Sequence, residues 1–175
     1  MAISSVSETS RKLSRLFAVL IVLGLILTVL GYYGPIVKVS GGSLDTGLSI
    51  TKLEAANTDR VKNEEPALKG LSPLKVFAKA AFIFGIVTIV WFVLLCVLFI
   101  DNPELVYIVI GGLTVLVAIM VLIFSFIVLS NFKGTPNVSY VFGYGGIFLP
   151  LGGLLLGGGT AGMALTTPKI ETLHA

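Results

Sequence analysis

Four long apolar runs set the limits on what this chain can fold into. They cover residues 16–37, 76–100, 105–129 and 141–165. Each is long enough to cross a hydrocarbon core of roughly 30 Å as a helix. A β-barrel strand is shorter and alternates between apolar and polar residues, whereas these runs are apolar on every face. Because a segment in lipid must satisfy its own backbone polar groups, the predicted fold class is an all-α membrane protein, a four-transmembrane-helix bundle.

The composition agrees with a chain that folds in lipid. Of its 175 residues, 55% are hydrophobic and 12% are charged, whereas about a quarter of the residues in a soluble domain are charged. A disordered tail, a collagen, a disulfide-stapled secreted domain and a nucleic-acid-binding module are excluded. The lipid bilayer is therefore the expected partner for most of the surface. The chain has one Cys, so it forms no intrachain disulfide.

Local signals mark the limits of the spans. Ser72 and Pro73 suit the first turn of the second span, and Pro103 with Glu104 suits that of the third. The basic residues before the first span resemble the start of a signal peptide. The apolar stretch is longer than a signal core and has no small-residue cleavage site, so an uncleaved span is predicted. The other segments are a mobile N-terminal segment 1–15, a large polar loop 38–75, a tight turn 101–104, a short loop 130–140 and a C-terminal tail 166–175.

The large polar loop carries a signal for β structure. Short alternating stretches on either side of Gly41 and Gly42 predict a β-hairpin, and residues 52–65, with charges of both signs, suit one short helix. Residues 138–140 of the short loop add a third strand in this interpretation. The alternative is that both loops are irregular and solvated.

Four spans place both ends of the chain on one side of the membrane, and the basic residues give conflicting signals about which side this is. Four lie on the side of the termini and eight on the side of the large loop, a count that favours a cytoplasmic loop. However, Arg11, Lys12 and Arg15 crowd the start of the first span, only Lys38 lies near its end, and the first span usually dominates. Cytoplasmic termini and an extracytoplasmic large loop are therefore expected.

Tyrosines gather at the loop-side boundary of the spans. They are Tyr32, Tyr33, Tyr140 and Tyr144. Because aromatic rings hold a span at headgroup depth, these residues are predicted to be membrane anchors rather than a ligand-binding box.

The spans contain almost no group that could carry out chemistry. Lys79 lies in the first turn of the second span, where its amine can reach the interface. A proton relay, a carrier of charged substrates or a voltage sensor needs ionisable residues deeper in the membrane, where each costs roughly 3 kcal/mol or more. Cys96 has no accompanying His or acid, and the one His, His174, lies in the tail. We therefore expect no enzyme activity, no catalytic residue, no cofactor, no metal site and no small-molecule substrate.

Five hydroxyl side chains lie within the spans. They are Thr28, Thr88, Thr114, Ser125 and Thr160. They are too few and too scattered to line a water-filled pore within one chain, and they are predicted to form hydrogen bonds between helices.

The strongest local pattern lies in the fourth span. Gly153, Gly157 and Ala161 repeat every four residues, and Gly158 and Gly162 form a second pair on a neighbouring face. Small residues at this spacing let two helix backbones approach closely where the hydrophobic effect provides no net drive. They predict a helix-packing interface. The pattern leaves open whether the partner is another span of the bundle or another chain, in a homo-oligomer or with other membrane subunits.

The order of the segments resembles that of the claudin and peripheral-myelin-protein superfamily, with four spans, a longer first loop with strand character, a tight second connection and a shorter third loop. Residues 140–146 (YVFGYGG) are similar to the aromatic and glycine residues that open the fourth span in some claudin-like proteins. The resemblance implies the same topology. The first loop contains neither the Trp nor the Cys residues of the claudin signature, so no functional residue is carried over.

Two functional hypotheses follow from these features. The first is a non-enzymatic structural, scaffold or accessory subunit that acts through packing of the fourth span and contacts of the large loop. The alternative is a channel or transporter component whose pore forms only in an oligomer. Packing through small residues is compatible with both.

Overall fold

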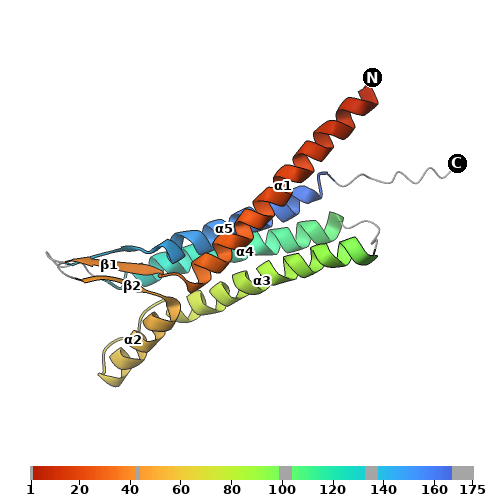
Figure 1. The fold of residues 1–175 in the computed structure, drawn as a ribbon. Helices are drawn as coiled ribbons and strands as arrows, with labels where there is room; N and C mark the ends of the chain where they lie inside the picture. Colours follow the sequence, from red (N-terminus) through yellow and green to blue (C-terminus); the bar gives the residue numbers. More distant parts are fainter. Residues whose placement is uncertain (1, 42–43, 99–103, 133–137, 167–175) are drawn as a thin grey trace.

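Four long apolar helices form the body of the molecule (Figure 1), seen in a computed structural model that describes residues 2–41, 44–98, 104–132 and 138–166. They are α1 (Ala2–Tyr33), α3 (Leu71–Leu98), α4 (Glu104–Leu129) and α5 (Tyr144–Met163). Each contains a stretch long and apolar enough to cross a membrane. The predicted four-helix fold class is therefore confirmed, and the helices fit a multi-pass integral membrane protein.

Helix α5 occupies the centre of the bundle. It packs along both α1 and α4, while α3 packs mainly against α4. Figure 1 shows α3, α4 and α5 side by side, whereas α1 crosses α5 and diverges from the bundle toward its N-terminal end. Helix α1 meets α3 near its loop-side end, where the rings of Tyr32 and Phe82 stack with centroids 4.9 Å apart. Much of α1 that does not face α5 therefore lies on the surface.

A three-stranded antiparallel sheet lies at the loop-side end of the bundle. Its strands are β1 (Val37–Gly41), β2 (Leu44–Leu48) and β3 (Ser139–Phe142), in the order β2-β1-β3. In this register Val37 lies opposite both Leu48 and Phe142. The short helix α2 (Ile50–Lys62) follows β2. The predicted hairpin, third strand and short helix are confirmed, so the alternative of irregular loops is wrong here. We refer to the sheet and α2 together as the cap.

The two ends of α1 differ from the predicted limits. The helix begins at Ala2, which places most of the segment predicted to be mobile within α1. No Gly or Pro interrupts the chain before Gly24, so nothing in the backbone chemistry stops the helix earlier. It ends at Tyr33 rather than residue 37, because Pro35 disfavours helical geometry in the residue before it and cannot complete the hydrogen-bond pattern.

The other spans also begin at different residues. Helix α3 starts at Leu71, five residues before the predicted limit, with the Ser-Pro pair in its first turn. Helix α5 starts at Tyr144 instead of residue 141, because residues 139–142 pair with β1. Residues 101–103 of the predicted tight turn and 167–175 of the predicted tail lie outside the described residues.

A buried apolar cluster joins the cap to the bundle. Ile36 before β1, Leu53 of α2 and Leu74 of α3 are fully buried. They belong to one cluster with Val121 and Val128 of α4. Since each of these elements contributes a side chain to one core, the cap is held against the ends of the helices.

Two asparagines fix the segment between α2 and α3. The Asn131 side chain accepts a hydrogen bond from the Lys69 amide (3.1 Å) and donates one to the Lys69 carbonyl (3.0 Å). It also donates to two carbonyls in the last turn of α4, at 2.9 and 3.1 Å. From the other side, Asn57 Oδ1 accepts a hydrogen bond from the Leu68 amide at 2.6 Å. The connection is thereby tied to α2 and to α4.

Candidate helix-packing site

One face of α5 lies directly on the backbone of α4. A Cβ atom added to Gly157 would lie 2.7 Å from the carbonyl oxygen of Gly111, and one added to Gly111 would lie 2.6 Å from the nitrogen of Ala161. A Cβ on Gly153 would lie 2.8 Å from the Cβ of Ala118. Protein atoms do not pack this closely, so these contacts require glycine. The structure places the ridge of Gly153, Gly157 and Ala161 against α4 of the same chain.

An adjacent face of α5 packs against α1 in the same way. A Cβ on Gly152 would lie 2.5 Å from the backbone nitrogen of Thr28, and one on Gly24 would meet the backbone of Leu156. Toward the other end of α5, a side chain on Gly162 would meet the ring of Phe17. The central helix is therefore in backbone contact with a neighbour on each of two faces.

Gly158 and Gly162, predicted to form one pair, have different surroundings. Gly162 is buried, whereas Gly158 is exposed and an added Cβ there would meet nothing within 4 Å. Gly112 of α4 is also exposed, and a Cβ added there would likewise meet nothing within 4 Å. Because Gly111 and Gly157 touch, their neighbours Gly112 and Gly158 lie at a similar depth beside the α4–α5 contact.

The prediction that hydroxyl groups link the helices is wrong for the threonines. Each donates a hydrogen bond of 2.7–2.8 Å to the carbonyl four residues earlier in its own helix. These residues are Thr28, Thr88, Thr114 and Thr160. A threonine hydroxyl can reach this carbonyl without a partner helix, so it forms the bond within its own helix rather than one to a neighbouring helix. The buried Ser125 hydroxyl has no hydrogen-bond partner among the described residues.

The four predicted tyrosine anchors fall into two groups. Tyr32 and Tyr140 pack against the buried cluster, and the Tyr140 ring stacks on Phe132 with centroids 5.1 Å apart. Tyr33 and Tyr144 are 71% and 52% exposed, at the loop-side ends of α1 and α5. The exposed pair is placed as membrane anchors would be, and the anchoring role stays a prediction.

Sequence reasoning missed the glycines that face α5 from its neighbours. Gly24, Thr28 and Gly31 are separated by four and three residues, which places them on one face of α1. In the structure Gly31 lies against the backbone of Leu149. This spacing was a usable signal, because three small residues on one helix face provide a surface that complements a glycine ridge.

The described residues offer no group of three or more His, Cys, Asp or Glu side chains that could hold a metal ion. Cys96 lies within α3. Comparisons with protein-family models, curated proteins and solved structures find no match for the chain. The similarity to the claudin superfamily rests on topology and stays a prediction.

Proposed function

We propose that this chain is a non-enzymatic structural or accessory membrane subunit that presents a rigid cap at one surface of the bilayer. The observation that carries the proposal is the backbone contact of α5 with both α1 and α4. A transporter needs one part of its bundle to move against another, and close-packed contacts on two faces of the central helix oppose such movement. Only residues 34–36 separate α1 from β1, so the cap is positioned directly by the bundle.

Two surfaces support contacts with other chains. On the cap, α2 exposes charged side chains of both signs, including Lys52, Asp59 and Lys62. Within the membrane, Gly158 and Gly112 leave open space beside the α4–α5 contact. A helix of a second copy or of another membrane subunit could approach closely there.

A claudin-like relationship forms part of the proposal. The first loop contributes two strands of the sheet, and the third strand leads through Gly143 into α5. This connection corresponds to the aromatic and glycine segment on which the resemblance was based.

Cytoplasmic termini and an extracytoplasmic cap are also proposed, because basic residues are concentrated before the first span. The test is a single Cys at Ala55, which is exposed on α2, in a Cys96→Ala background. In intact cells this Cys is expected to react with a membrane-impermeant maleimide, whereas a Cys introduced at Ser4 is expected to react only after permeabilisation. The reverse pattern would invert the topology.

A flux measurement on purified protein separates a structural subunit from a channel. In liposomes, the protein is expected to give no ion or small-solute flux above empty vesicles, because glycine contacts close the centre of the bundle. Flux proportional to the amount of protein, and lost when α5 is altered at Gly157, would overturn the proposal.

Association through the open glycines is tested by cross-linking in native membranes. A Cys at position 158 in the Cys96→Ala background is expected to form disulfide-linked pairs or to cross-link to another subunit. A Cys at Ile83, which is also exposed within a span, is the matched control and is expected to stay monomeric. Equal cross-linking at both positions would indicate random collision.

A further inference from the structure

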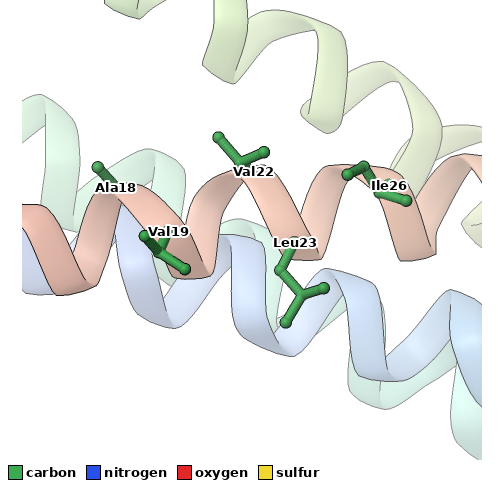
Figure 2. Close-up of a pocket in the computed structure, with 5 residues that line it drawn as sticks. All are labelled: Ala18, Val19, Val22, Leu23 and Ile26. Carbon is green, nitrogen blue, oxygen red and sulfur yellow. The ribbon is translucent and has the colours of Figure 1, made fainter.

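The outer surface of α1 and the core of the bundle differ in what their side chains require of a partner. An apolar groove on α1 is lined only by hydrocarbon side chains, so any lipid tail satisfies it. Figure 2 shows the lining residues, Ala18, Val19, Val22, Leu23 and Ile26. A polar group inside the bundle is different, because it is costly to leave such a group without a hydrogen bond in a membrane.

Ser125 of α4 is a polar group of this kind. Its side chain is fully buried, and its hydroxyl has no hydrogen-bond partner among the described residues. The threonines within the spans each donate to the carbonyl four residues earlier, but Ser125 forms no such bond to Val121. Its hydroxyl is therefore available to a group outside its own helix.

Pro150 of α5 creates a second unpaired group. It lies inside the helix and is buried. Because proline has no backbone N–H, the carbonyl four residues earlier loses its hydrogen bond within the helix. That carbonyl belongs to Gly146, which is also buried. The core thus contains an acceptor as well as a donor without its usual partner.

The register of α4 and α5 brings these two groups to the same level. The two helices are antiparallel, because their contacts advance along α4 as they go back along α5, and Ala118 lies against Gly153. Seven residues, or about two turns, lead from Ala118 to Ser125 on the same face of α4. The same step back along α5 leads from Gly153 to Gly146. The hydroxyl and the carbonyl therefore belong to facing positions of one helix contact.

We propose that a water molecule is bound between α4 and α5 at this level. It accepts a hydrogen bond from the Ser125 hydroxyl and donates one to the Gly146 carbonyl. Buried waters in proteins bind polar groups that are otherwise unpaired, and a bridging water is nearly as favourable as a direct hydrogen bond. Serine and glycine contribute little volume at this level, which favours a ligand as small as water.

The bound water ties the first turns of α5 to α4. A proline inside a helix normally permits a kink, because it interrupts the hydrogen-bond ladder. Here the carbonyl that Pro150 leaves unpaired is linked to the neighbouring helix instead. Since β3 leads directly into α5, this link also fixes the direction in which α5 leaves the cap.

The first test is a double-mutant cycle, with SDS-induced unfolding in mild detergent as the measurement. Ser125→Ala is expected to raise the equilibrium constant for unfolding about tenfold, because it leaves the Gly146 carbonyl unpaired. Pro150→Ala restores a backbone donor to that carbonyl. In this background Ser125→Ala is expected to change the constant by at most about twofold. The control is Thr114→Val, on the same face of α4, whose hydroxyl bonds within its own helix. It is expected to have the same effect in both backgrounds.

The second test observes the water directly. Infrared difference spectra are recorded on hydrated membranes in ordinary water and in water enriched in heavy oxygen. We expect a water O–H stretching band that shifts with the isotope in the wild-type protein, is lost in Ser125→Ala and is kept in Thr114→Val. This comparison does not need Pro150→Ala, so it tests the proposal even if that variant fails to assemble.

Three results would overturn the proposal. An equal effect of Ser125→Ala in both Pro150 backgrounds would show that the hydroxyl serves only its own helix. Greater stability of Ser125→Ala than of the wild-type chain would show that the hydroxyl is unpaired. Coupling in the cycle without the isotope-sensitive band would mean that Ser125 bonds the Gly146 carbonyl directly, with no water between them.

Discussion

The substitution Gly157→Ala tests how the bundle is held together. The new methyl group would lie 2.7 Å from the Gly111 carbonyl oxygen and 2.8 Å from Val115 Cγ2. The first of these atoms belongs to the backbone of α4, so the helices must separate to accommodate it. Overpacking of this kind costs about 1–3 kcal/mol. Replacing Gly by Ala within a helix stabilises it by about 0.5–1 kcal/mol, so we expect a net loss of stability of up to about 2.5 kcal/mol.

The neighbouring residue provides the control. Gly158→Ala makes the same change in helix propensity, but its methyl group enters open space. We expect it to leave stability unchanged or raise it by up to about 1 kcal/mol in a monomer. The difference between the two variants therefore isolates the packing term, about 1–3 kcal/mol.

The measurement is SDS-induced unfolding of the protein in mild detergent, followed by fluorescence of its one Trp. Gly111→Ala and Gly112→Ala on α4 form a second matched pair, because an added Cβ is obstructed at the first position and free at the second. Combining Gly111→Ala with Gly157→Ala is expected to cost less than the sum, since both methyl groups open the same gap. Equal stability of the Gly157 and Gly158 variants would refute the α4–α5 contact described above.

Three further outcomes are expected. Asn131→Ala removes the hydrogen bonds that tie the α2–α3 connection to α4, and should lower the free energy of unfolding by about 1–3 kcal/mol in thermal melting. The control Ser130→Ala, at an exposed site, should change the free energy of unfolding little. Glu54→Gln removes the ion pair with Lys75, whose partners are both about 40% exposed, so we expect a loss of at most about 1 kcal/mol that disappears at high salt. Thr114→Val should keep the bundle intact, with a change under about 1 kcal/mol, because its hydroxyl serves only its own helix; a loss of several kcal/mol would indicate an interhelical bond.

The spans were predictable because their signal is local. An apolar run longer than 20 residues has few alternatives to a helix in lipid. The alternating pattern around Gly41 is also local, and it predicted the hairpin of β1 and β2. Helix limits were harder, because they depend on partners. Residues 141–142 are as apolar as the span that follows, and only pairing with β1 shows that they belong to a strand.

The site was predictable as a pattern but not as an arrangement. The spacing of Gly153, Gly157 and Ala161 identified a close-packed ridge, but small residues carry no information about which helix they meet. Gly157 and Gly158 are adjacent in the sequence, yet Gly157 contacts the backbone of α4 whereas Gly158 faces open space. The prediction of hydrogen bonds between helices was wrong for the threonines for another reason. In a helix, a threonine hydroxyl can always reach the carbonyl four residues earlier, so it needs no neighbouring helix as a partner.

The central position of α5 has a consequence for biosynthesis. The ribosome completes α1, α3 and α4 before it makes β3 and α5, so the face of α1 around Gly24 has no partner during most of translation. At about 5–20 residues per second, this interval is on the order of ten seconds. During it, α1 must remain inserted as a separate helix in lipid or in the insertion machinery. The arrival of α5 then closes the bundle and adds the third strand of the sheet in one late step. A chain terminated before Ser139 would lack both, and would present α1 to membrane quality control without the helix that it packs along.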